Sequence, residues 1–275
     1  MSTLRFPDQH SYTSPKPTYE LARYDDANSN LQLAATNTLR IHHGHSVIYT
    51  ATLQIPNQPA QAVICKVVLG KRGVARLRNE VDMYWRIAEL QGDVVPRCFG
   101  LFEGELEDGP SACLVLQDCG ERLYKEFFAT SWTFRYDLII AMSKIHNAGV
   151  AHRDFAPRNI VVSNDNKPFI IDFDRAKKHD CYAATDIIFN TPEPREMRDQ
   201  CQELWLACKS VDVWKPRSLR YMGYFVPLEY ADTPEMLATR APEGTPEEEA
   251  LKQARLSIAI HKERMRLRAH CLYYS

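Results

Sequence analysis

The sequence predicts an α+β fold, with an antiparallel sheet and one helix in its first half and mainly helices in its second. Two observations predict it. Short apolar runs with strand-like alternation, separated by turns, recur between residues 38 and 117, with a single helical stretch among them. Beyond residue 118, apolar residues mostly recur at three- and four-residue steps, the period of a helix. The composition, 45% hydrophobic and 25% charged, is that of a soluble globular protein with a large core.

The predicted sheet has five strands. Residues 38–55 alternate on both sides of His43-Gly44-His45 and predict two strands joined by a turn. The third strand is expected at 61–69, and the last two at 97–102 and 112–117. Residues 1–36 are rich in Ser, Pro, Asn and Asp, so we expect an extended or disordered arm there, with Tyr19, Leu21 and Tyr24 as the residues through which it could pack locally.

The helix expected at 73–91 carries a stripe of apolar residues that includes Val74, Leu77 and Val81. Glu80 neighbours this stripe, and a carboxylate that faces an apolar surface needs a cationic partner. Lys66, in the third strand, is the candidate. We therefore expect Lys66 and Glu80 to form an ion pair.

The second half is expected to contain a helix at 132–147, which Gly149 ends, and a hairpin formed by residues 160–162 and 168–171. Two more helices are predicted at 195–208 and 245–270. The acidic start and basic end of the last one suit the helix dipole, and its apolar stripe favours packing against the protein over binding to a membrane.

Composition narrows the classes of function. The formal net charge is −1, which argues against a nucleic-acid-binding surface. The eight cysteines form no C-x-x-C pair, which argues against a zinc ribbon. The N-terminus has no apolar signal region, and no apolar run approaches the roughly 18 residues that span a bilayer. We expect an intracellular protein, cytoplasmic or nuclear, with no nucleic-acid or membrane partner.

The most informative stretch is His152-Arg153-Asp154 with Asn159 after it, which reads H-R-D-x-x-x-x-N. A short apolar run follows and ends in Asp172-Phe173-Asp174. In phosphoryl transfer from ATP, one carboxylate orients the attacking hydroxyl, while an amide and a second carboxylate hold Mg²⁺ against the phosphates. The stretch supplies these three groups, each beside an apolar strand-like run.

With these motifs, the chain resembles the protein-kinase-like superfamily over roughly residues 37 to 176. The run Ala62-Val63-Ile64-Cys65-Lys66 looks like the V-A-I-K strand, and Glu80, Asp154, Asn159 and Asp172 follow in family order. The resemblance implies a bilobal fold, with a five-stranded N-lobe at 37–117 and a C-lobe at 118–275 that is abbreviated after residue 174. The short region after Asp172 also resembles small-molecule kinases such as the aminoglycoside and choline phosphotransferases. The H-R-D stretch and the near V-A-I-K strand favour the protein-kinase side, as in short kinase-like proteins of filamentous fungi.

The resemblance also implies roles for single residues. Asp154 would be the catalytic base or hydroxyl-orienting group, and Arg158 would supply a positive charge to the phosphate. Asn159, Asp172 and Asp174 would hold Mg²⁺. His152 would brace the loop and Phe173.

Nucleotide binding is expected from a second set of residues. Lys66 would contact the α- and β-phosphates of ATP, steered by Glu80. The other residues of this set lie in the loop that covers the nucleotide or beside the hinge between the lobes; they are Gly44, Val47, Gln117 and Cys119.

Three features depart from the family pattern. The covering loop, residues 41–47, has one glycine where the pattern has three, which leaves fewer backbone amides free to approach phosphates. Its histidines, His42, His43 and His45, also allow a metal interpretation, without a supporting cysteine or carboxylate pattern. The metal loop is D-F-D instead of D-F-G, so Asp174 is either a second metal contact or a plain cap. No A-P-E segment follows.

The function that fits these motifs is an ATP- and Mg²⁺-dependent kinase that transfers the γ-phosphoryl group to a hydroxyl of a protein or small molecule. Two alternatives remain open. The single-glycine loop and the missing A-P-E favour a pseudokinase that binds partners without phosphoryl transfer. AMP transfer uses the same fold with the nucleotide inverted.

Overall fold

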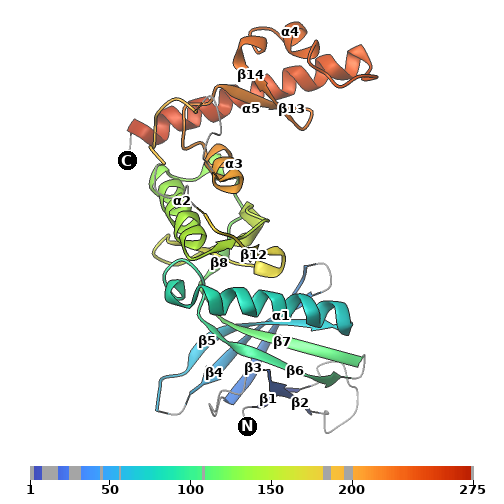
Figure 1. Ribbon diagram of the computed structural model, residues 1–275, viewed down its shortest axis with the longest axis vertical. Helices are drawn as coiled ribbons and strands as arrows, with labels where there is room; N and C mark the ends of the chain where they lie inside the picture. Colours follow the sequence, from blue (N-terminus) through green and yellow to red (C-terminus); the bar gives the residue numbers. More distant parts are fainter. Residues whose placement is uncertain are drawn as a thin grey trace. The chain divides into compact units, whose positions relative to one another are not determined.

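The computed structural model describes residues 3–7, 18–24, 32–43, 46–55, 57–106, 109–181, 187–194 and 201–273. The chain forms two compact units. The first combines Met1–Leu123 with Lys144–Cys181, and the second combines Tyr124–Ser143 with Tyr182–Ser275. The predicted α+β class is confirmed (Figure 1). The predicted lobe boundaries stay a prediction.

The first unit is built on a seven-stranded antiparallel sheet with the order β1-β2-β6-β7-β5-β4-β3. Its strands are β1 Thr3–Pro7, β2 Thr18–Arg23, β3 Gln32–His43, β4 Ser46–Gln54, β5 Gln61–Leu69, β6 Cys98–Leu106 and β7 Gly109–Gln117. The last five are the predicted strands. β1 and β2 are additional and come from the region expected to be an arm. Leu21 of β2 is fully buried in the core, which explains why this polar segment joins the sheet.

Strand alternation gives the sheet two different faces. Val63, Cys65 and Val67 of β5 belong to one apolar cluster, together with Leu53 of β4 and Phe102 of β6. Successive side chains of a strand point to opposite faces, so Lys66 lies on the other face. Helix α1, Gly70–Arg86, covers that face (Figure 1).

The helix α1 presents its apolar stripe to the sheet. Val74, Leu77, Val81 and Tyr84 are buried, and Glu80, between them, is completely buried too. The predicted helix is therefore confirmed, with one more turn at its start and a 3-10 turn, η1 Ala88–Leu90, at its end.

Short elements of the first unit position the loop that carries the H-R-D stretch. Strand β9, Val150–Ala151, pairs with β12, Lys177–Lys178, and leads into this loop. The predicted hairpin is confirmed as β10, Ile160–Val162, with β11, Pro168–Ile170. Strand β8, Glu121–Arg122, pairs with β10, and two 3-10 turns, η3 Pro157–Asn159 and η4 Phe173–Arg175, complete this part.

Gly120, between β7 and β8, has a backbone that only glycine fits. Its φ is +115°, and a Cβ atom there would lie 2.2 Å from the carbonyl oxygen of Val162. We expect Gly120→Ala to lower the free energy of unfolding by at least about 2 kcal/mol, because left-handed strain adds to a backbone clash. Gly70→Ala is the matched control, since its φ is +77° but nothing lies within 4 Å. Urea denaturation compares them, and equal losses would contradict the clash.

The second unit is mainly helical. Helix α2, Trp132–Asn147, is the predicted one, and its residues up to Ser143 belong to this unit. The remaining elements are η2 Phe127–Ala129, α3 Gln202–Ser210, β13 Ser218–Tyr221, β14 Tyr224–Pro227, η5 Leu228–Tyr230, α4 Pro234–Ala238 and α5 Glu247–Tyr273. α3 and α5 confirm the last two predicted helices; residues 195–200 lie outside the described residues.

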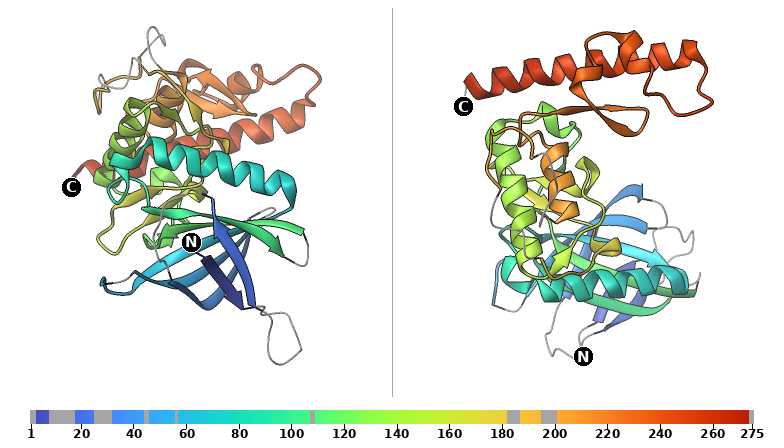
Figure 2. Two further views of the ribbon diagram at one scale, coloured as in Figure 1. Left: turned by 60° about the horizontal axis from the view of Figure 1, so that its bottom comes forward. Right: turned by 45° about the horizontal axis from the view of Figure 1, so that its top comes forward.

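Helix α5 packs along the β13–β14 hairpin and α4 (Figure 2). Ala254 and Ile258 of α5 meet Leu219 and Val226 of the hairpin in one cluster. Further along, Arg264 pairs with the buried Asp212 at 2.6 Å. Among the described residues, no helix is both long and apolar enough to cross a membrane.

Candidate active site

Lys66 joins two carboxylates of the first unit. Its Nζ atom lies 2.7 Å from Oε2 of Glu80 and 2.5 Å from Oδ1 of Asp172. The exposed fractions are 13% for the Lys66 side chain, 1% for Glu80 and 33% for Asp172. The predicted Lys66–Glu80 ion pair is confirmed. The direct contact between Lys66 and Asp172 is an addition that sequence reasoning missed.

The protonation states in this cluster depend on the contact of two carboxylates, Glu80 and Asp172, with one amine, Lys66. Burial lowers the pKa of Lys66, but the carboxylates of Glu80 and Asp172 outweigh burial and hold the pKa above its ordinary value. The lysine is therefore an ammonium ion at neutral pH. Burial raises the pKa of Glu80, Asp172 adds to this, and the ammonium of Lys66 opposes it. The cluster contains two carboxylates, those of Glu80 and Asp172, and one ammonium group, that of Lys66. This excess of negative charge favours the binding of a second cation.

His152 holds the H-R-D loop to the strand that precedes Asp172. Its Nδ1 atom accepts the backbone N–H of Asp154 at 3.2 Å, so Nε2 carries the proton and donates to the carbonyl of Ile171 at 2.9 Å. Its ring centroid lies 4.8 Å from that of Phe173. The expected bracing role of His152 is confirmed.

The carboxylate of Asp154 is held on both sides. The guanidinium of Arg158 donates to Oδ1, and the amide of Asn159 donates to Oδ2 at 3.1 Å and to the Asp154 carbonyl at 2.8 Å. Because the Asn159 NH₂ group is turned to Asp154, its amide oxygen points away from this carboxylate. That oxygen and the partly exposed Asp172 carboxylate are hard oxygen donors, the type that suits Mg²⁺.

Asp172 has a left-handed backbone, with φ 70° and ψ 67°. A residue other than glycine adopts this conformation only where its surroundings hold it. Here the ion pair with Lys66 holds the side chain, and Phe173 is buried with its ring 5.1 Å from that of Tyr84. Asp172, two residues after the end of β11, is thereby aimed at Lys66.

The other predicted site residues have different surroundings, and one of them lies outside the described residues. The pKa of Glu80 is raised mainly by burial, and the charge of Asp174 contributes to this rise. The carbonyl of Asp174 accepts the amide of Asn79 at 3.2 Å, and Asp174 lines a basic cavity of about 510 Å³ with Arg153, Arg175 and Lys177. Among the predicted nucleotide residues, Val47 lies in β4, Gln117 ends β7, Cys119 follows it and is buried, and Gly44 is outside the described residues. Burial raises the pKa of the Cys119 thiol to about 12.

One comparison bears on these residues. Residues 138–186 match the model of the Lipopolysaccharide kinase (Kdo/WaaP) family. This family belongs to the protein-kinase-like superfamily, so the resemblance stated from the motifs is confirmed for this part of the chain. The matched segment contains Asp154, Asn159 and Asp172, whereas Lys66 and Glu80 precede it. The match supports a kinase-like phosphotransferase in general.

Proposed function

We propose that the protein is an ATP- and Mg²⁺-dependent phosphotransferase that moves the γ-phosphoryl group to a hydroxyl acceptor. The observation that carries this proposal is the position of Lys66, whose ammonium is held between Glu80 and Asp172. The fully buried carboxylate of Glu80 orients the Lys66 side chain. A bilobal arrangement with the nucleotide beside Lys66 is part of the same proposal.

Each residue then has one task. Lys66 binds the α- and β-phosphates, and Glu80 keeps its ammonium in place. Asp172 and the amide oxygen of Asn159 are the ligands for Mg²⁺, which neutralises phosphate charge when it is bound. Asp154 accepts a hydrogen bond from the acceptor hydroxyl and takes its proton as the phosphoryl group arrives. Arg158, which pairs with the Asp154 carboxylate, supplies positive charge to the phosphate.

The test is incubation of the whole chain with γ-labelled ATP, Mg²⁺ and a panel of acceptors. The panel contains proteins with Ser, Thr and Tyr, aminoglycosides, choline and 3-deoxy-manno-octulosonic acid, because the matched family is named for kinases of lipopolysaccharide. We expect transfer of label to one class. A thermal shift with ATP and Mg²⁺ accompanies the assay, since a ligand that binds the native state raises its stability. No shift and no label with any acceptor would favour the pseudokinase.

Asp172→Asn is expected to weaken Mg²⁺-dependent nucleotide binding more than Asp174→Asn does. Asp172 contacts Lys66 directly, whereas the carbonyl of Asp174 accepts a hydrogen bond from Asn79 and Asp174 lines the cavity that also contains Arg153, Arg175 and Lys177. Removing one anionic ligand should cost roughly tenfold or more in affinity. ATP titrations at several Mg²⁺ concentrations measure it. Equal losses in the two variants would mean that both carboxylates share the metal.

A further inference from the structure

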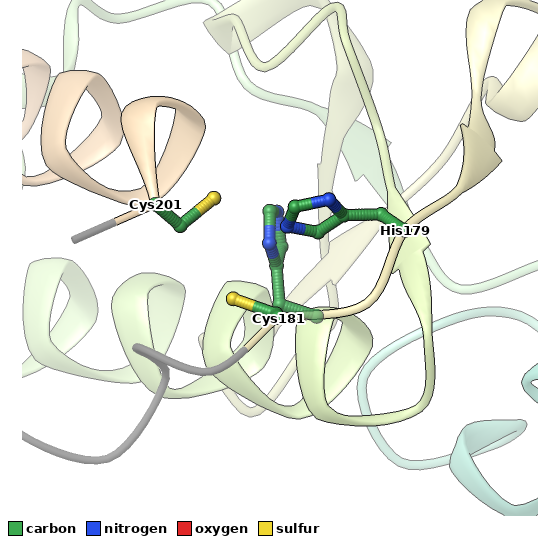
Figure 3. A group of neighbouring side chains, drawn as sticks. His179, Cys181 and Cys201 are labelled. Atoms are coloured by element: carbon green, nitrogen blue, oxygen red, sulfur yellow. The ribbon is translucent and has the colours of Figure 1, made fainter. Parts of the chain in front are cut away.

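We propose that His146, His179 and Cys181 form a zinc site in the first unit. These three belong to a group of possible metal ligands, found among the described residues, whose ligand atoms all lie within 4.8 Å of one another. No part of the phosphotransferase site uses them. Figure 3 shows His179 and Cys181 on one short stretch of chain, just beyond β12.

The backbone explains how residues distant in sequence meet here. His146 lies in the last turn of α2, and the N–H of Gly149 donates to its carbonyl at 2.9 Å. The carbonyl of Gly149 in turn accepts the N–H of His179 at 3.0 Å. Pairing of β9 with β12 continues this connection. The chain beyond Asp172 is therefore fastened beside the end of α2 before any metal binds.

The side chains follow the backbone. The ring centroids of His146 and His179 lie 5.1 Å apart with the rings nearly perpendicular. His146 is fully buried, and His179 and Cys181 are half-buried, so the group is shielded on one side and reachable on the other. A buried imidazole that faces a second imidazole and a thiol has the environment of a metal ligand more than that of an apolar core residue.

The donor set selects the ion. Two imidazoles and one thiolate suit Zn²⁺, which takes tetrahedral nitrogen and sulfur ligands. With zinc–nitrogen distances of about 2.0 Å and zinc–sulfur distances of about 2.3 Å, ligand atoms of a tetrahedral site lie roughly 3.3–3.8 Å apart. The ligand atoms, which lie within 4.8 Å of one another, therefore need to approach each other by about 1 Å when zinc binds. Binding converts the Cys181 thiol to a thiolate and releases its proton to solvent.

With three protein ligands, the fourth position of a tetrahedral zinc ion is left to a water molecule. Cys201, the third side chain labelled in Figure 3, precedes α3 and belongs to the second unit, so the proposal rests on the three ligands of the first. The spacing His179-x-Cys181 could have pointed to the site in the sequence. The chain lacks a C-x-x-C pair, which is the more common sequence sign of a zinc site.

The zinc site would influence the phosphotransferase site by holding the strands next to it in place. Strand β9 runs directly into His152, and β12 follows the η4 turn that begins at Phe173. A metal that fixes His179 and Cys181 to the end of α2 holds both strands of this pair. The bound metal would stabilise the segment after Asp172, which is short in this chain.

The experiment measures metal content and does not depend on kinase activity. The whole chain, expressed with added zinc, is analysed by mass spectrometry of its metals. We expect one zinc ion per chain in the wild type, and loss of it in His179→Ala and Cys181→Ser. Cys98→Ser and His261→Ala are the matched controls, because both residues lie outside the group, and both variants should keep the zinc.

A cobalt titration covers the case in which the variants fail to fold. Wild-type chain stripped by a chelator is titrated with Co²⁺, and circular dichroism checks its fold. We expect the visible bands of tetrahedral cobalt and a thiolate-to-cobalt charge-transfer band, with reversal by excess Zn²⁺. Wild-type chain without stoichiometric zinc and without these bands would overturn the proposal. So would retention of zinc in both folded ligand variants.

Discussion

Asp154→Ala is expected to abolish phosphoryl transfer and to leave the affinity for ATP nearly unchanged. In the proposed mechanism Asp154 acts on the acceptor hydroxyl and not on the nucleotide, so ground-state binding of ATP should not depend on it. Loss of positioning and of proton acceptance should reduce the rate on the order of 10²- to 10⁴-fold. Two measurements on the same proteins are needed, an ATP titration and a turnover assay.

The structure adds a reason to include a second variant. The Asp154 carboxylate also accepts hydrogen bonds from Arg158 and Asn159, so an alanine removes both and leaves Asn159 only its bond to the Asp154 carbonyl. Asp154→Asn keeps one acceptor oxygen and removes the charge and the basicity, but its NH₂ group then faces either Arg158 or Asn159 in place of an oxygen. We expect it to lose turnover as well, with less effect on thermal stability. Asp165→Ala, at the exposed tip of the β10–β11 hairpin, is the control. Unchanged turnover in Asp154→Asn would contradict the catalytic assignment.

Local sequence patterns predicted the elements that carry the site. The periodicity of α1 and β5 predicted both the buried face of the helix and the pairing of Glu80 with Lys66, because a charge placed in an apolar stripe demands a partner. The hairpin after Asn159 followed from its turn residues. In these elements the secondary structure that the local sequence favours is the one that the tertiary structure contains. The sequence alone was therefore sufficient to predict them.

The parts that were missed depend on contacts between distant segments. β2 lies in a polar region where packing of Leu21 was expected, but the pairing of β2 with β1 and β6 was not. Asp172, the third residue of the lysine cluster, reaches Lys66 because its backbone is left-handed. No residue pattern in the sequence predicts this conformation. The imidazoles of His146 and His179 meet through hydrogen bonds to Gly149. None of these contacts has a local signal in the chain.

Lys66→Met is expected to destabilise the fold, and Glu80→Gln is expected to reverse much of that loss. Removing the ammonium leaves a fully buried carboxylate without its cation, which typically costs about 3–5 kcal/mol. In the double variant no buried charge is left behind, so it should be more stable than Lys66→Met at pH 8. Lys144→Met is the matched control: its pair with Asp93 is exposed, and such pairs contribute about 1 kcal/mol or less.

The pH dependence separates this cause from a simple loss of packing. Burial already raises the pKa of Glu80, and Lys66→Met removes the ammonium that opposes the rise. A carboxyl group whose pKa is higher in the folded than in the unfolded state binds its proton more tightly when folded, so stability falls as the pH rises between the two values. Lys66→Met should therefore lose stability from pH 5 to pH 8 relative to the wild type, and the double variant should not. Urea denaturation at both pH values measures this difference. A Lys66→Met chain with wild-type stability at pH 8, or with a deficit that Glu80→Gln leaves unchanged, would show that Glu80 is not held as a buried charge by Lys66.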